Sequence, residues 1–520
     1  MITRTLLVSI AFAAAVVHGQ ELKEESVVTV AIPDQKYCVN PMIYGQMFEH
    51  VNDPMMYGGL LNEDGTERPH VNRLMKELTI PIIRWPGGTL VHEYDWKNAI
   101  GPLDQRPKTY IQRWKIHDSN RFGTDEFIQY CRKIGAEPYI NFNMSTTGFK
   151  GSKLSDALEW LEYVNGAADS KWRKIRARNG HPKPSNVKYF CLGNENYASN
   201  GVNKKETAAG YGQRCKSWAT AIRARYPSVE LLAVGYDLSW NRGVLEEAGQ
   251  HIDWLTVHAY VTSVLKNGKL KDPEGVLFAS AKMDACLRKI CRQVNEANRK
   301  FGRASRPIRV SIDEWNNRHK VSGTLSRMDD RRQFDAAVVG GMLNAFVRNS
   351  PSVGMANYIF PVDSHGLIRT IGDGEAFKTP IYYVFQQYRK WMIGQRLDAS
   401  VTGPGLGSEK RPAPASITSA PAKFPPVKRN VPFVDAAAVM DSGTLTMALI
   451  NRSHEEVMSV KLKLPKGYRP TECWQLAHPN IYARNTATSR EEVVPIRDDF
   501  ADETLKLRPC GLYLVRCEDK

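Results

Sequence analysis

Two glutamates stand at the ends of short apolar runs, where their carboxyl groups could act together on one bond. Glu195 follows Phe-Cys-Leu-Gly-Asn, and Glu314 follows Val-Ser-Ile-Asp. They are 119 positions apart (314 − 195), so only a closed fold can bring them together. Hydrolysis of a glycosidic bond uses such a pair, because one carboxyl group protonates the leaving oxygen while the other attacks the anomeric carbon or activates water. The two glutamates therefore predict this chemistry.

From about residue 40 to 390, short apolar runs alternate with helical patterns, which indicates a parallel sheet with covering helices. The candidate strands are Ile43–Glu49, Ile80–Trp85, Glu137–Asn143, Val187–Gly193, Val229–Gly235, Trp254–Tyr260, Ile308–Asp313 and Ala356–Val362. They predict a (β/α)8 TIM barrel over residues 41–392, with Glu195 and Glu314 after its fourth and seventh strands, where barrel active sites form. A doubly wound sheet is the alternative, but no Gly-rich phosphate loop follows the first strand.

A second region is expected over residues 393–520. Residues 402–430 are rich in Pro, Ser, Ala and Lys, which is typical of a mobile loop or linker. Beyond them, alternating segments such as Thr444–Ile450 and Leu512–Val515 predict a C-terminal antiparallel β-sandwich domain. The run Val27–Ile32, in the segment 20–40, is also strand-like and is expected to join that sandwich.

The N-terminus has the pattern of a targeting segment. Arg4 gives a basic start, Leu6–Val17 is apolar and uncharged, and small residues follow up to Gly19. We expect a signal peptide over residues 1–19, cut after Gly19, and therefore a secreted or periplasmic protein. No later stretch approaches the ~20 apolar residues of a membrane span, so no membrane partner is expected.

Nine cysteines are scattered without a CxxC pair, so a zinc site is not expected. Export would permit disulfides, with Cys286–Cys291 and Cys510–Cys517 as candidate pairs. Several cysteines lie in apolar strand-like runs such as Tyr189–Leu192, and buried free thiols fit those runs better.

The chain is strongly basic, with a formal net charge of +16. One interpretation is an acidic partner, such as a sulfated or uronic-acid polysaccharide, and the favoured alternative is a solvated basic surface. No recognition motif supports a nucleic-acid partner. A hydrophobic fraction of 42% with 24% charged residues is typical of a globular protein and excludes wholesale disorder.

Five segments resemble the α-L-arabinofuranosidases of glycoside hydrolase family 51, in that family's order: Tyr44–His50, Arg84–Gly88, Tyr94–Trp96, Leu192–Glu195 and Asp313–Asn316. The tail, at Val431–Ala436 and Asn451–Ser453, also resembles that family's C-terminal sandwich. The resemblance implies a retaining, exo-acting hydrolase of arabinofuranose-bearing plant or algal polysaccharide or oligosaccharide. Glu195 would be the acid/base, with a raised pKa, and Glu314 the nucleophile. No metal or other cofactor is implied, and members of the family often assemble, so a homo-oligomer is possible.

The resemblance also assigns substrate-binding roles, each with a structural alternative. Arg84 would hold Glu314 ionised, Glu49 would bind sugar hydroxyls, and Asn194 would contact the hydroxyl beside the anomeric carbon. The alternatives are a structural ion pair for Arg84, a surface acid for Glu49 and a structural amide for Asn194.

Four further residues complete the expected site. His258 and Tyr260 resemble the family's His-x-Tyr at the sixth strand, and Tyr260 would bond to the nucleophile or the sugar. The alternative for His258 is a structural histidine with no role in catalysis. Trp96 and Trp315 could offer an apolar face to a sugar ring, or could belong to the core.

The sequence departs from the family pattern at Thr89, where Asn or Cys is common, and at Phe360, where Gln is common. A retaining hydrolase of another linkage, of the β-xylosidase or endo-β-glucanase type, is therefore the alternative function. A non-catalytic carbohydrate-binding protein is the third interpretation, although both glutamates are present.

Overall fold

The computed structural model describes residues 25–49, 55–167, 169–372, 374–407 and 430–519. The expected signal peptide and most of the expected Pro-rich loop lie outside these residues. In the described part of the chain, no helix is long and apolar enough to cross a membrane.

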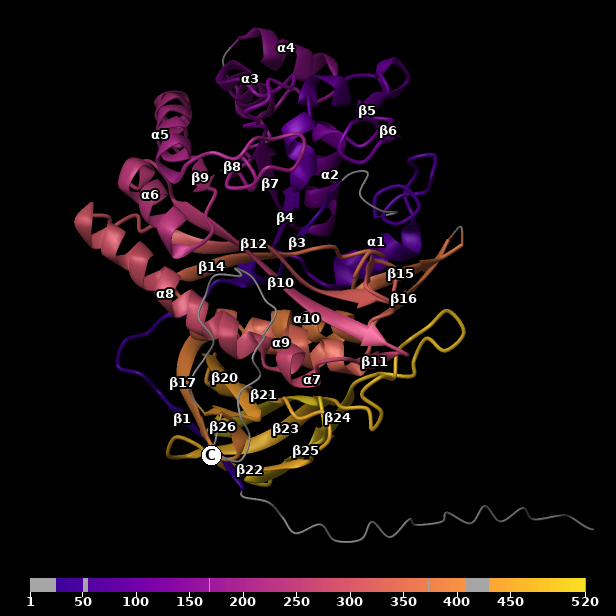
Figure 1. The fold of residues 1–520 in the computed structure, drawn as a ribbon, viewed down its shortest axis with the longest axis vertical. Coiled ribbons are helices and arrows are strands. Elements are labelled where there is room, and N and C mark those ends of the chain that lie inside the picture. Colours follow the sequence, from indigo (N-terminus) through magenta and orange to yellow (C-terminus); the bar gives the residue numbers. More distant parts are fainter. Residues whose placement is uncertain (1–24, 50–54, 168, 373, 408–429, 520) are drawn as a thin grey trace, which may run out of the picture.

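Eight parallel strands close into a barrel in the upper part of Figure 1. In chain order they are β3 (Gly45–Met47), β4 (Ile82–Trp85), β7 (Glu137–Phe142), β8 (Tyr189–Leu192), β9 (Glu230–Ala233), β10 (Trp254–Lys266), β12 (Arg309–Val321) and β14 (Val353–Tyr358). Each pairs with the next, and β14 pairs with β3. The predicted TIM barrel is confirmed, and all eight candidate strands overlap an observed one.

Helices on the outer side of the barrel connect the strands, as the βα order requires. They are α1 (Pro69–Glu77), α2 (Thr124–Ile134), α3 (Leu154–Asn165), α4 (Lys171–Arg178), α5 (Ala208–Arg225), α6 (Leu238–Ala248), α7 (Pro273–Leu277), α8 (Ala279–Lys300), α9 (Gln333–Arg348) and α10 (Pro380–Trp391). α2 shows how the sequence sets the bounds of a helix. Glu126 accepts a hydrogen bond from the backbone N–H of Gly123 at its start, and Gly135 ends it at φ 82°.

Short elements decorate the barrel. The 3₁₀ helices are η1 (Pro41–Tyr44), η2 (Thr89–Glu93), η3 (Trp96–Ala99) and η4 (Leu103–Gln105). Two-stranded pairs are formed by β5 (Thr109–Ile111) with β6 (Ile116–Asp118), β15 (Ile368–Ile371) with β16 (Glu375–Lys378), and β18 (Gly405–Leu406) with β19 (Val431–Pro432). β11 (Lys269–Leu270) and β13 (Thr324–Ser326) extend the edges of β10 and β12 beyond the barrel.

The remaining strands form the predicted antiparallel domain below the barrel in Figure 1. They are β1 (Ser26–Ala31), β2 (Cys38–Val39), β17 (Gly394–Thr402), β20 (Val434–Asp441), β21 (Thr444–Asn451), β22 (Met458–Lys463), β23 (Tyr468–Leu476), β24 (Ile496–Asp499), β25 (Thr504–Leu507) and β26 (Leu512–Asp519). β1 pairs antiparallel with β17 and parallel with β22, so the N-terminal segment is part of this sheet.

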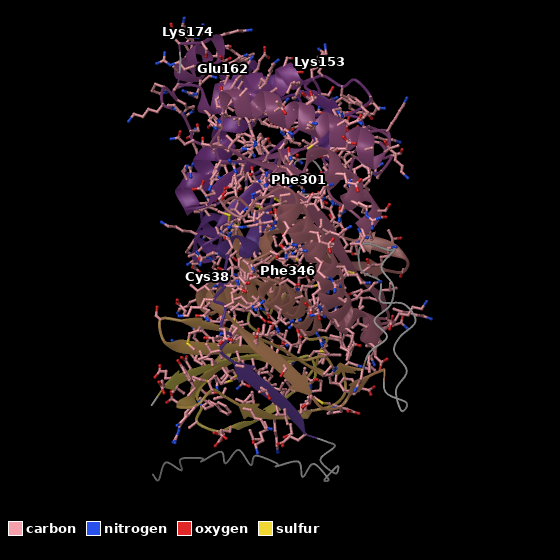
Figure 2. The ribbon with its side chains drawn as sticks, turned by 90° about the vertical axis from the view of Figure 1, so that its left-hand side faces the viewer. Cys38, Lys153, Glu162, Lys174, Phe301 and Phe346 are labelled. Carbon is pink, nitrogen blue, oxygen red and sulfur yellow. The ribbon has the colours of Figure 1, made fainter. Side chains whose placement is uncertain are left out.

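The barrel and the β-domain share one core, and α9 lies between them. Its middle approaches the sheet so closely that a Cβ at Gly340 would lie 2.3 Å from Leu512 Cδ1. Asn344 donates to Asp435 and to the carbonyl of Ala448. Phe346, labelled in Figure 2, packs on the barrel side against Trp315 with ring centroids 5.0 Å apart. The two parts therefore hold each other in a fixed arrangement.

All nine cysteines are free and eight are buried, with only Cys38 exposed. The candidate disulfides are therefore wrong, and the interpretation as buried thiols is confirmed. Burial raises the pKa of Cys286 and of Cys291 to about 12, which leaves both thiols protonated and unreactive near neutral pH.

Candidate active site

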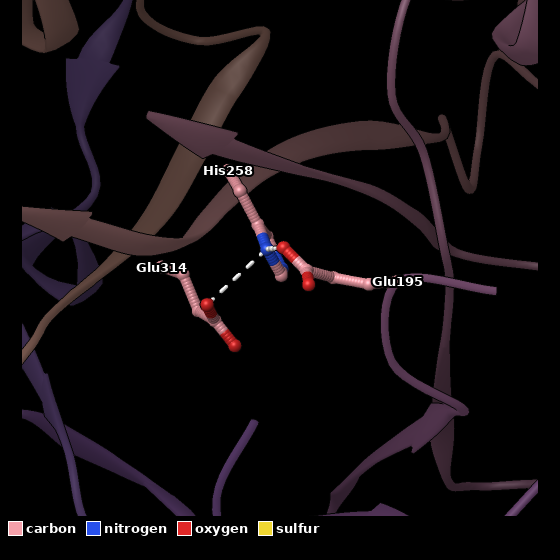
Figure 3. Close-up of side chains that lie close together, drawn as sticks. All are labelled: Glu195, His258 and Glu314. Atoms are coloured by element: carbon pink, nitrogen blue, oxygen red, sulfur yellow. Dashed lines mark hydrogen bonds and ion pairs between the residues drawn. The ribbon is translucent and has the colours of Figure 1, made fainter. Parts of the chain in front are cut away.

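The two glutamates meet at the carboxyl ends of the barrel strands, with His258 between them (Figure 3). Glu195 follows β8, His258 lies on β10 and Glu314 lies on β12. One carboxylate oxygen of each glutamate and a ring nitrogen of His258 lie within 4.8 Å of one another. His258 Nδ1 is 2.8 Å from Glu195 Oε1 and 3.2 Å from Glu314 Oε2. This spacing suits the ~5–5.5 Å carboxyl separation of retaining glycosidases, because no room is left for a water between the carboxylates.

Both oxygens of Glu314 are held by donors. Arg84 Nη1 lies 2.7 Å from Oε1, and the hydroxyl of Tyr260 donates to Oε2 over 2.5 Å. Arg84 is fully buried, and its Nε is 3.4 Å from Asp313. Although burial lowers the pKa of Arg84, Asp313 and Glu314 together raise it well above its usual value. The guanidinium of Arg84 and the hydroxyl of Tyr260 therefore hold the two oxygens of Glu314 in one orientation.

Glu195 is more accessible, with 26% of its side chain exposed. It accepts hydrogen bonds from Tyr197 and from His258. The expected rise in its pKa is wrong. Burial raises the pKa of this carboxyl, but the hydrogen bond and charge of His258 bring it below its usual value.

His258 therefore holds the proton that Glu195 was expected to hold. Burial lowers the pKa of this imidazole, but the charge of Glu314 and the contacts with Asp313 and Glu195 raise it to about 10. A protonated His258 beside an ionised Glu195 carries the same total charge as a neutral His258 beside a protonated Glu195. Since one hydrogen bond joins the two groups, the pair stores one proton that either can carry.

Asn194 is fixed beside the carboxylates by two contacts. Its Oδ1 accepts from Arg84 Nη2 over 2.7 Å, and its carbonyl accepts from His92 Nε2 over 2.6 Å. Burial lowers the pKa of His92 to about 4, so this ring is neutral and its one N–H points at Asn194. The amide Nδ2 of Asn194 is buried and has no partner among the described residues, which leaves it as a donor for a ligand hydroxyl.

The Pro-Gly-Gly turn after β4 brings Glu49 to the same place. Glu49 Oε1 accepts from the backbone N–H groups of Gly88 and Leu90. A Cβ at Gly88 would lie 2.7 Å from Glu314 Oε1 and 3.5 Å from Glu49 Oε1. There is therefore no room for a side chain at position 88. Because glycine has none, both Glu49 and Glu314 can approach the turn.

The two tryptophans lie elsewhere. Trp96 is 1% exposed and stacks on Trp160 of α3 with ring centroids 5.8 Å apart. Trp315 is fully buried among the helices outside the barrel, against Phe346 and Phe385. Their prediction as sugar-binding surfaces is wrong, because neither ring has an exposed face.

Sequence reasoning missed several residues that shape the site. Tyr197 bonds to Glu195, His92 fixes Asn194, and Asp313 contacts both Arg84 and His258. Asp313 was visible beside Glu314, whereas His92 carries no local signal because its partner is 102 positions away.

The cluster Glu195–His258–Glu314 also has the donor types of a metal site. However, Arg84 already supplies a cation to Glu314, and both ring nitrogens of His258 face carboxylates. The donors are therefore arranged for proton and charge chemistry more than for holding a divalent ion.

Comparisons with known proteins find relatives over most of the chain. Residues 74–272 match the model of the alpha-L-arabinofuranosidase 1 domain, and residues 313–509 match that of the alpha-L-arabinofuranosidase C-terminal domain. Alpha-L-arabinofuranosidase C of Emericella nidulans is 30% identical over 479 residues, covering 86% of this chain and 89% of that protein. The family 51 α-L-arabinofuranosidase structure from Thermotoga petrophila superposes with a TM-score of 0.79 at 29% identity, covering 95% of this chain and all of the other.

A bacterial relative corrects one expectation. The Bacillus subtilis protein named intracellular exo-alpha-(1->5)-L-arabinofuranosidase 1 is 28% identical over 494 residues, covering 89% of this chain and 93% of its own. That protein is named as intracellular, so the inference of a secreted or periplasmic protein from residues 1–19 is contradicted and is withdrawn.

Proposed function

Because this chain belongs to the α-L-arabinofuranosidases of glycoside hydrolase family 51, we propose that it removes terminal arabinofuranose from oligosaccharide or polysaccharide chains with retention of configuration. Glu314 acts as the nucleophile and Glu195 as the acid/base. The observation that carries this proposal is the spacing of the two carboxylates, with reacting oxygens within 4.8 Å.

In the first step, a Glu314 oxygen attacks the anomeric carbon while the bond to the leaving oxygen breaks and Glu195 supplies a proton to that oxygen. Arg84 and Tyr260 hold Glu314 in one orientation, so the attack needs little reorganisation. As the ester forms, Glu314 loses the charge that most raises the pKa of His258. The stored proton is thereby released toward Glu195 at the moment when the leaving group needs it.

In the second step, the Glu195 carboxylate takes a proton from water, the water oxygen attacks the anomeric carbon, and Glu314 leaves as a carboxylate. Two inversions give net retention. Glu49 and the free amide donor of Asn194 lie beside the nucleophile, where we place the hydroxyl groups of the sugar.

A panel of aryl glycosides tests the substrate class. We expect fast release from the α-L-arabinofuranoside and little from the β-D-xyloside, β-D-glucoside or β-D-galactofuranoside. NMR of the first-formed sugar should show the retained anomer, and linear arabinooligosaccharides should yield arabinose alone. Preferred turnover of another glycoside would mean that Thr89 and the buried Phe360 have changed the pocket, and would support the β-xylosidase or endo-β-glucanase alternative.

The shared proton predicts a specific pH effect of His258→Asn. In the wild-type protein the pair keeps its proton until His258 titrates, and the pKa of that imidazole is raised to about 10. Asparagine keeps a donor for Glu195 but stores no proton, so the alkaline limb should report Glu195 alone. We expect the alkaline limb of kcat/KM to move to lower pH, measured from pH 4 to 11 with an arabinooligosaccharide, whose leaving group needs a proton. An unchanged limb would show that His258 does not share the catalytic proton.

A further inference from the structure

A groove of about 820 Å³ lies away from the catalytic carboxylates. Its walls are one face of α8, the loop 302–307, the turn 349–352 between α9 and β14, and Tyr37 with Arg396. In Figure 2, the labels Phe301 and Cys38 mark the chain neighbours of two groove residues, Gly302 and Tyr37. The lining contains six arginines and no aspartate, glutamate or lysine: Arg288, Arg292, Arg299, Arg303, Arg348 and Arg396.

The α8 face is a regular stripe. Arg288, Arg292, Asn295 and Arg299 are spaced by four, three and four residues, which places them within about 60° of arc on an α-helix. Asn295 is exposed, and its amide donates to Ser352 across the groove over 3.3 Å. The stripe therefore presents guanidinium groups and an amide to one side of the groove.

The carboxylates behind the groove do not balance its charge. Four of the six groove arginines have carboxylate partners. Arg303 pairs with Asp253, Arg288 and Arg348 share Asp284, Arg348 also pairs with Asp435, and Arg396 pairs with Asp398. Arg292 and Arg299 are exposed and have no carboxylate partner in the part of the chain that the structure describes. The groove thus combines a concave shape with uncompensated positive charge, which concentrates anions.

The groove lies at the opposite end of the barrel from the candidate active site. Its residues 302–307 and 349–352 come before β12 and β14, whereas Glu314 lies five residues into β12 (314 − 309). At ~3.3 Å per strand residue, about 17 Å of barrel separates the two levels. A ligand in the groove therefore does not occupy the catalytic centre.

We propose that this arginine groove is a second carbohydrate site, which binds the uronate carboxylates of an acidic polysaccharide and tethers the enzyme to it. Guanidinium forks match carboxylate oxygens in pairs, and Asn295 and Ser352 offer partners for sugar hydroxyls. Tyr37 is the one aromatic residue in the lining, and Arg396 lies over its ring. Successive nucleobases would need several aromatic platforms, so the lining favours an acidic glycan over a single-stranded nucleic acid.

The test is the double variant Arg292→Gln/Arg299→Gln, which removes the two unpaired guanidinium groups and keeps the helix propensity of α8. The matched control is Arg178→Gln/Arg225→Gln, with the same change of charge on exposed arginines of α4 and α5 outside the groove. Binding to polygalacturonate at low salt, measured by affinity electrophoresis, should weaken about tenfold in the first variant and little in the second. Turnover of an aryl arabinofuranoside should be unchanged in both, and the binding result stands whether or not that substrate is cleaved.

The same binding assay with other ligands identifies which chemical class the groove prefers. Neutral arabinan should show no groove-dependent binding, and inorganic phosphate should compete only weakly. Equal weakening in the control variant would overturn the proposal, because it would mean that binding reports overall charge. Groove-dependent binding to heparin or to an oligonucleotide but not to polygalacturonate would also overturn it, as would a groove-dependent dimer seen by light scattering.

Discussion

Glu314→Ala is expected to lower kcat on an aryl arabinofuranoside by on the order of 10⁵-fold. Its neighbour Asp313 cannot replace the nucleophile, because Asp313 is turned toward Arg84 and Tyr139. The loss should be similar for good and poor leaving groups, since attack on the anomeric carbon itself is missing. Initial rates with two aryl leaving groups of different acidity measure this directly.

Two companion experiments separate chemistry from folding. Alanine leaves the buried Arg84 without one partner, which can cost about 3–5 kcal/mol of stability, so Glu314→Gln should be measured beside it because an amide oxygen can still accept from Arg84. Glu230→Gln is the control, since Glu230 lies at the start of β9 and bonds to Trp254. Azide added to Glu314→Ala should give the glycosyl azide of inverted configuration. Appreciable activity in both Glu314 variants would remove Glu314 from the nucleophile role.

The barrel could be predicted from the sequence because its strands are short, buried runs between helices. β4, for example, is buried at every position, so it reads as a continuous apolar segment interrupted only by Arg84. The positions at which the barrel strands end were less predictable. β10 and β12 continue far past the barrel as one paired ribbon, because each finds a partner in the other up to Leu265 and Val321. Such a long-range pairing has no local signature.

The sequence allowed us to predict that the two glutamates lie together, but not that the two tryptophans are buried away from them. Side chains alternate along a strand, so Trp315 points to the helix layer when Glu314 points to the barrel mouth. Alternation alone would also turn Asp313 away from the barrel mouth, yet Asp313 contacts His258 there. The register between β12 and β14 shifts between Ile312 and Trp315, and this irregularity lets two consecutive acids reach the site. Period-two reasoning cannot foresee it.

The pKa of Glu195 was mispredicted for a related reason. A buried carboxyl beside a second carboxylate should titrate high, and burial does act in that direction. His258 reverses the result because it lies between the two acids, although it is 63 positions from Glu195 in the sequence. A raised pKa therefore appears on the imidazole, and under the proposed mechanism Glu195 and His258 share the acid/base function.

Glu195→Ala is expected to affect the two half-reactions differently. Turnover of arabinooligosaccharides, whose leaving group needs a proton, should fall about 10³-fold. With a dinitrophenyl leaving group the first step needs no proton and should proceed rapidly, whereas the second step still lacks its base. We therefore expect a burst of dinitrophenol equal to the enzyme concentration, followed by slow steady-state release, measured by stopped-flow absorbance.

Azide identifies the missing group in this variant. It needs no deprotonation, so it should restore the steady-state rate of Glu195→Ala and give the glycosyl azide of retained configuration, opposite to the product from Glu314→Ala. Tyr197→Phe is the matched control, because it removes a hydrogen bond to Glu195 but leaves the carboxylate and His258 in place. A variant with no burst, no rescue and equal losses on all substrates would mean that Glu195 only orients His258, and the proton donor would then have to be His258 itself.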